Sequence, residues 1–129
     1  MVTTMLFGPT LAAQPLDVDW FYRSSANGTS ESLVDLAVGA DERSVATGEL
    51  IRRFDFQNSD VLTVAVDRQG NELWSDRYIG SANGADRGLP VALGPDGATY
   101  VAAQSDGGPS SLDILTLKYS ATAERNVNA

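Results

Sequence analysis

The sequence predicts an all-β fold made of two consecutive strand-rich units, for three reasons. Much of the segment from Trp20 to about Asp67 reappears, with small differences, from Trp74 to about Tyr119. Each unit alternates short runs rich in Val, Leu, Thr and aromatic residues with clusters of Gly, Asn, Asp and Ser, a pattern typical of strands joined by turns. No window keeps the i, i+3, i+4, i+7 apolar spacing of an amphipathic helix.

Three matched blocks define the correspondence between the units. Ser25–Gly28 recurs as Ser81–Gly84, Ala37–Asp41 recurs as Ala92–Asp96, and Asp60–Val64 recurs as Asp113–Leu117. The offset between the copies falls from 56 to 55 to 53 residues along these blocks. Insertions and deletions therefore fall between the apolar runs, where loops tolerate them. A period of roughly 50 residues indicates stacked supersecondary units.

The apolar runs give the expected strands. They are 33–38, 44–50, 60–67 and 72–78 in the first unit, and 89–93, 98–104 and 112–119 in the second. The turn Gly94-Pro95-Asp96-Gly97 supplies the dihedral angles that a tight hairpin needs. The matching turn of the first unit ends with Glu42 instead of a second Gly, so we expect it to be less favourable.

Four motifs of the second unit follow one another along the chain. They are Trp74-x-x-x-Tyr78-x-Gly80, Asn83-Gly84-x-Asp86, Ala92–Gly97 followed by Tyr100-Val101, and Leu112–Tyr119. Together they resemble one unit of the β-propeller repeats that occur in tandem in large secreted or surface-exposed bacterial proteins. The resemblance covers about 100 of the 129 residues, in two copies. The first copy departs more, with Ser24-Ser25 after the aromatic residue, Glu42 in the turn and Val66 in place of the final Tyr.

The resemblance implies two four-stranded antiparallel propeller-type blades. Closed propellers use about four to eight blades, so the chain would form an incomplete β-propeller. The implied divisions are 1–16 as an N-terminal arm or remnant of a signal peptide, 17–78 as the first repeat, 79–120 as a second, incomplete repeat, and 121–129 as a C-terminal tail. The alternative is a small sandwich or open paired sheet, for which 129 residues and 43% hydrophobic content suffice.

Composition excludes several classes of function. Seventeen acidic against nine basic residues give a formal charge of -8, which argues against nucleic acid or an anionic membrane as a partner. The chain contains no His and no Cys, so it cannot form a Ser-His-Asp triad, a Cys-His pair or a His- or Cys-ligated zinc centre. We therefore expect no catalytic residue, no cofactor and no resident metal.

Some acidic residues resemble fragments of calcium sites. Asp17 and Asp19 would share one face of a strand, and Asp96-Gly97 and Asp106-Gly107-Gly108 resemble pieces of calcium loops. Neither loop has the alternating oxygen ligands and terminal Glu of an EF-hand. The hydrogen bonds of a turn explain both loops better than calcium binding does. For Asp17 and Asp19, a pair of carboxylates facing solvent is commoner than a calcium site.

Two pairs of residues occupy equivalent positions in the units. Trp20 and Trp74 are expected to wedge between adjacent sheets; the alternative is a sugar-stacking platform that also includes Tyr78 and Tyr100. Asp60 and Asp113 begin matched strands, where we expect each carboxylate to accept backbone N–H groups and fix a turn. The alternative is a ring of acids lining a channel, which needs more blades.

The resemblance favours a non-enzymatic scaffold or interaction module of a secreted or surface protein. Its partners would be neighbouring propeller blades or a second copy of the chain. Other proteins and carbohydrate are further candidate partners. The alternative is part of a carbohydrate-binding or enzymatic propeller whose site needs further blades. Residues 5–14 look like the tail of a secretory signal without its basic region, which favours an extracellular or cell-surface location. No run approaches the 18 or so apolar residues of a spanning helix.

Overall fold

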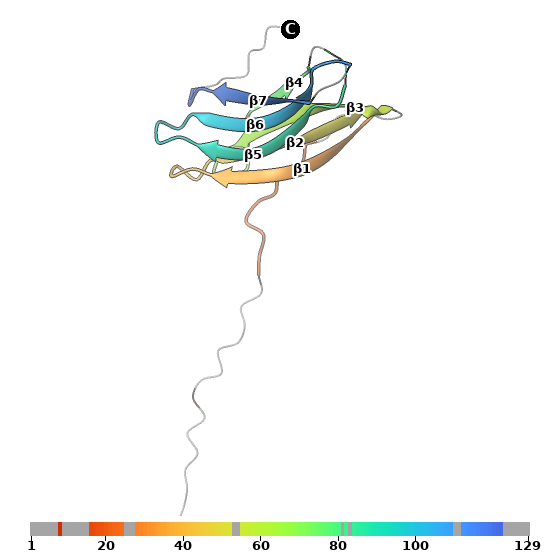
Figure 1. The fold of residues 1–129 in the computed structure, drawn as a ribbon. Coiled ribbons are helices and arrows are strands. Elements are labelled where there is room, and N and C mark those ends of the chain that lie inside the picture. Colours follow the sequence, from red (N-terminus) through yellow and green to blue (C-terminus); the bar gives the residue numbers. More distant parts are fainter. Residues whose placement is uncertain are drawn as a thin grey trace, which may run out of the picture.

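Seven strands form two antiparallel sheets (Figure 1). The computed structural model describes residues 8, 16–24, 28–52, 55–80, 82, 84–109 and 112–122, and for 55–57 only the backbone. The first sheet contains β1 (Thr29–Val38), β2 (Ser44–Arg52), β3 (Asp55–Val66) and β4 (Glu72–Tyr78); the second contains β5 (Arg87–Leu93), β6 (Thr99–Asp106) and β7 (Leu112–Tyr119). Within this part of the chain there is no helix, so the predicted all-β class is confirmed.

The two sheets differ in size. The first has the four strands expected of it, in the order β1-β2-β3-β4, but among the described residues the second has three, in the order β5-β6-β7. The expectation of two four-stranded sheets was therefore wrong for the second unit. The second unit has only three apolar runs, 89–93, 98–104 and 112–119, and these correspond to the three strands that its described residues form.

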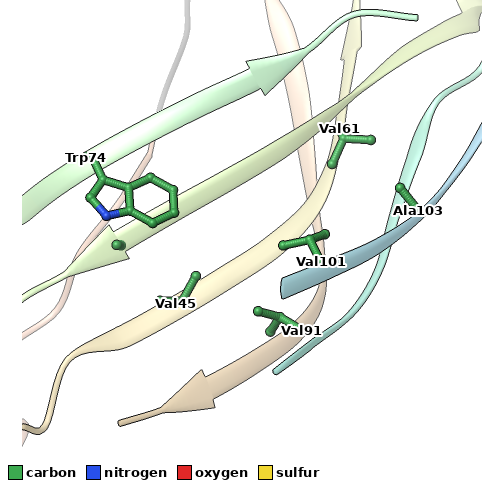
Figure 2. Packing of buried hydrophobic residues seen from close by; sticks show 7 residues of the cluster. Val45, Val61, Trp74, Val91, Val101 and Ala103 are labelled. Carbon is green, nitrogen blue, oxygen red and sulfur yellow. The ribbon is translucent and has the colours of Figure 1, made fainter. Parts of the chain in front are cut away.

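The hydrophobic core lies between the sheets. β5 packs across β1, β2 and β3, and Figure 2 shows core side chains from both sheets gathered in one layer. The buried cluster contains Val45, Val61, Ala65 and Trp74 from the first sheet and Val91, Val101 and Ala103 from the second. Side chains of β6 alternate between buried and more exposed positions along the strand, so Val101 and Ala103 both point into the core.

Polar contacts also join the sheets. They are Val91 N–H to Asp35 Oδ2 at 2.9 Å, Arg87 Nε to Glu49 Oε1 at 2.6 Å, and Tyr119 Oη to Asp76 Oδ2 at 2.8 Å. The backbones approach closely at Gly88, where a Cβ atom would lie 2.4 Å from Thr47 Oγ1. No larger residue fits there without moving β5 away from β2.

Three hairpin turns share one geometry. In Gly39–Glu42, Asp67–Gly70 and Gly94–Gly97, the N–H of the fourth residue donates to the carbonyl of the first at 2.9–3.0 Å. The fourth residue has a positive φ in each case: 62° at Glu42, 84° at Gly70 and 79° at Gly97. Glu42 thus occupies a left-handed conformation that favours glycine.

Candidate functional site

An apolar groove lies on the face of the first sheet that points away from the second. Along β3, Val61 and Ala65 face the core, so the intervening Leu62 and Val64 face the groove. The groove has a volume of about 330 Å³. Its lining is mostly apolar and includes Leu33, Leu36, Ala46, Leu62, Val64 and Val66.

The segment 16–24 forms one wall of this groove. It is called the arm from here on and is not the predicted N-terminal arm 1–16. Trp20, Tyr22 and Ser24 line it, whereas the intervening Phe21 and Arg23 are exposed. This alternation is that of an extended strand with one face against the sheet. The arm therefore lies on the first sheet without being one of its strands.

Two contacts hold the arm in place. The Trp20 ring lies directly on Gly70, where a Cβ atom would come within 2.7 Å of the indole, so the turn requires glycine for this contact as well as for its dihedral angles. The Tyr22 hydroxyl donates to Glu72 Oε2 at 2.6 Å. Partial burial, with the neighbouring Glu72 carboxylate, raises the Tyr22 pKa to about 12. The hydroxyl therefore remains a donor at all physiological pH values.

The two tryptophans lie on opposite faces of the first sheet. Trp74 is buried between the sheets, with its ring centroid 4.9 Å from that of Tyr119 and an interplanar angle of 30°. This is the wedging position predicted for it. Trp20 lies in the groove on the far side and is 39% exposed.

Of the other aromatic residues of the predicted sugar platform, Tyr78 lies on the same face of β4 as Trp74 and packs against the core, half-buried. Tyr100 lies on the outer face of β6, with Lys118 Nζ 5.3 Å from its ring centroid. The four aromatic residues therefore do not form one exposed platform, because Trp74 and Tyr78 are in the core while Trp20 and Tyr100 lie on two separate outer faces.

Asp60 and Asp113 also have different surroundings. Asp60 is fully buried, and its carboxylate is bound by Arg77, whose Nε lies 2.5 Å from Oδ2, with Arg52 Nη2 at 3.9 Å. Guanidinium groups thus take the place of the backbone N–H groups expected there. Asp113, the second residue of β7, is exposed, and Asp60 lies within β3, so neither residue begins its strand as predicted.

Asp86 is a buried carboxylate whose role the sequence did not reveal. Its oxygens accept hydrogen bonds from Gly80 N at 2.5 Å, Ser105 Oγ at 2.6 Å and Asp106 N at 3.3 Å. Its own N–H donates to the Ser59 carbonyl at 2.7 Å. Asp86 therefore joins the β4–β5 connection to β3 and β6. The motif Asn83-Gly84-x-Asp86 was the only signal in the sequence, and it did not show burial.

The acidic turns are explained by their own hydrogen bonds. Asp96 Oδ1 accepts from Ala98 N at 3.1 Å, and Asp106 Oδ1 accepts from Gly108 N at 3.0 Å. Among the described residues, no three acidic side chains gather in a way that could hold a metal ion. The described part of the chain also contains no helix long and apolar enough to cross a membrane.

Comparison with protein-family models, with curated proteins and with solved structures found no match for this chain. The function must therefore be inferred from the groove, the arm and the faces of the two sheets.

Proposed function

We propose that the chain is a non-enzymatic interaction module built of β-propeller-type sheets and belonging to a secreted or surface protein. The observation that supports this best is the apolar groove on the outer face of β1–β3. Leu36 and Val38 on β1 are 53% and 63% exposed, and apolar patches of this kind mark surfaces that bind another protein.

The side chains on the two faces of β2 and β3 indicate what kind of partner the groove binds. β2 and β3 carry apolar or small residues on both faces, which is the pattern of a strand covered on both sides. In this molecule only one of the two faces is covered by a sheet. The open face of the first sheet therefore fits a β-sheet of a binding partner, packed at about 10 Å.

Carbohydrate binding has less support. A sugar site combines an aromatic platform with several convergent polar groups. Here only Trp20 of the four candidate aromatic side chains lines the groove, and the other lining side chains are mostly apolar. The Trp20 ring packs against Gly70 in the β3–β4 turn, so one of its faces is not free to stack on a sugar.

Binding of the apolar dye 8-anilinonaphthalene sulfonate to the folded chain tests this function. We expect enhanced dye fluorescence, with quenching of Trp20 emission by the nearby dye. Leu36→Glu should abolish the enhancement, because it places a charge in the groove. The matched control is Leu73→Glu on β4, which is 44% exposed but does not line the groove, and it should bind dye as wild type does.

Two results would refute the proposal. One is equal dye binding by both variants, which would mean that the groove is not an accessible apolar surface. The other is a shift of Trp20 emission by soluble oligosaccharides that Trp20→Phe removes, which would establish sugar binding in its place.

A further inference from the structure

The second sheet has an open edge where the first has a fourth strand. In the first sheet β3 pairs with both β2 and β4. β7 pairs only with β6 among the described residues. The other edge of β7 therefore presents backbone N–H and C=O groups that can pair with an additional strand.

The arm has the residue pattern of β4. Trp20 and Arg23 have the spacing of Trp74 and Arg77. In β4, Trp74 packs on Tyr119 at the end of β7. In the arm, Trp20 lies in the groove with Val66, the residue that corresponds to Tyr119 at the end of β3. The contact of Trp20 with the outer face of the first sheet thus resembles the contact of Trp74 in β4 with the facing second sheet.

The charges follow the same correspondence. Within the first sheet, Arg77 of β4 binds Asp60 of β3. The equivalent residues are Arg23 in the arm and Asp113 in β7, and both are exposed. Neither forms an ion pair with the residues that the structure describes. A strand carrying Arg23 that pairs with β7 as β4 pairs with β3 brings these two charges together.

The outer faces of the two sheets are also matched. Leu36 and Val38 on the open face of the first sheet correspond to Val91 and Leu93, which pack in the core. On the open face of the second sheet, Ile114 is 90% exposed and corresponds to the buried Val61. Each open face thus carries counterparts of residues that already pack face to face inside the molecule.

From these observations we propose that a second copy of this chain completes the second sheet. Residues 20–24 of one copy pair with the free edge of β7 of the other, and Arg23 binds Asp113 across this pair. The arm of a molecule lies on the opposite side of its first sheet from its own β7, so the strand comes from another molecule. The contact joins two different faces, so it is a head-to-tail interface.

This proposal deepens the proposed function, on which it rests, by naming the occupant of the groove as a second copy. Sedimentation velocity over a range of concentrations, with each variant first checked for folding by circular dichroism, provides the test. Wild type should associate reversibly. Arg23→Asp alone and Asp113→Arg alone should each weaken association at least about tenfold, because like charges then face each other across the strand pair. The chain with both substitutions should regain association, because the pair is restored with its signs exchanged.

Cysteine cross-linking tests the register without relying on charge, since the chain has no Cys of its own. Tyr78 pairs with Val61 between β4 and β3, so Ser24 and Ile114 are the corresponding positions of the arm and β7. A mixture of Ser24→Cys and Ile114→Cys chains, oxidised with glutathione disulfide, should give a mixed dimer. The matched control replaces Ile114→Cys with Ile79→Cys, which is also exposed but lies after β4, and should give little mixed dimer.

A monomeric wild-type chain at all concentrations would overturn this inference while leaving the interaction module intact if the groove still binds dye. Association that neither single substitution weakens, or that the double substitution fails to restore, would refute the pairing of the arm with β7. Equal cross-linking in the test and control mixtures would do the same.

Discussion

Two buried carboxylates, Asp60 and Asp86, are stabilised by different means. Removing a carboxylate from water costs several kcal/mol unless charges or donors compensate it. Asp60 is compensated by the positive charge of Arg77, and Asp86 by two backbone N–H groups and the Ser105 hydroxyl. Asp86 therefore depends on the paths of two segments, the β4–β5 connection and the end of β6, whereas Asp60 depends on the flexible side chains of Arg77 and Arg52.

Asp86→Ala should destabilise the fold by about 3–5 kcal/mol. The substitution leaves three donors without their acceptor, at about 1–3 kcal/mol each, and the desolvation cost that the buried carboxylate no longer carries offsets part of this sum. Urea unfolding followed by circular dichroism measures the change. Asp96→Ala is the control, because Asp96 is exposed and binds only the nearby Ala98 N–H, and it should cost about 1 kcal/mol or less. Equal losses would show that Asp86 acts only as a local turn residue.

Tyr22 should make stability depend on pH in the alkaline range. Its pKa is raised from 10.0 to about 12 in the folded chain, by burial and by Glu72. The folded state therefore keeps the proton longer than the unfolded state, and the Tyr22 contribution is complete below pH 10 and lost as pH rises toward 12. The difference in unfolding free energy between wild type and Tyr22→Phe should be constant up to about pH 9 and shrink above pH 10. A difference that stays constant to pH 12 would mean that the hydroxyl does not bind Glu72.

Single-residue roles were predictable where they depend on local sequence. Trp20 and Trp74 were both expected to wedge between sheets because they occupy equivalent positions in the two units. Trp74 does so, but Trp20 lies in the outer groove and is 39% exposed. The burial of Asp86 was not predictable. Its partner Gly80 is six residues away in the β4–β5 connection, whereas Ser105 comes beside Asp86 only when β5 pairs with β6.

At the scale of the elements, the strands and turns were predicted well because they are local. β4 and β7 begin and end at the predicted residues. β1 and β3 begin earlier than predicted, at Thr29 and Asp55. Apart from Phe56, their first residues are polar and show no apolar alternation. Residues 29–32 of β1, and Asp55 and Ser59 of β3, pair through the backbone with β2 and extend the strands. Backbone pairing of this kind leaves no hydrophobic signal in the sequence.

Glu42→Gly should stabilise the chain by about 0.5–1 kcal/mol. A side chain in the left-handed conformation costs about 1–2 kcal/mol, and the greater backbone freedom of glycine in the unfolded chain offsets part of that gain. Thermal or urea unfolding measures it. The converse change, Gly97→Ala in the matching turn, should destabilise by about 1–2 kcal/mol. An unchanged midpoint for Glu42→Gly would indicate that this turn relaxes out of the left-handed region in solution.

At the scale of the whole molecule, each sheet offers one covered and one open face. The sequence predicted strand-rich units but not which face of each would remain open, because both faces of β2 and β3 carry apolar or small residues. The apolar runs predicted three strands in the second unit, and the described residues form three; the fourth strand was implied only by the resemblance.

Association between copies should strengthen as salt is added. Each chain carries a formal charge of -8, so two copies repel, and raising the ionic strength from about 0.01 to 0.1 M shortens the screening length from about 30 to 10 Å. The dissociation constant measured by sedimentation should fall several-fold over this range. A rise would mean that the Arg23–Asp113 contact outweighs the net repulsion, since salt weakens that pair as well.

The order of strands also affects how the protein is made. Each sheet is a meander whose strands pair with their neighbours in sequence, so the first sheet can form as soon as β4 leaves the ribosome. Its core face, with Val45, Val61 and Trp74, then has no cover until β7 follows. At about 5–20 residues per second, the roughly 40 residues from β4 to β7 leave this apolar surface bare for about 2–8 s. Slower translation across 79–119 should lengthen the interval in which a nascent chain binds chaperones, and ribosome profiling with chaperone pull-down would detect that interval.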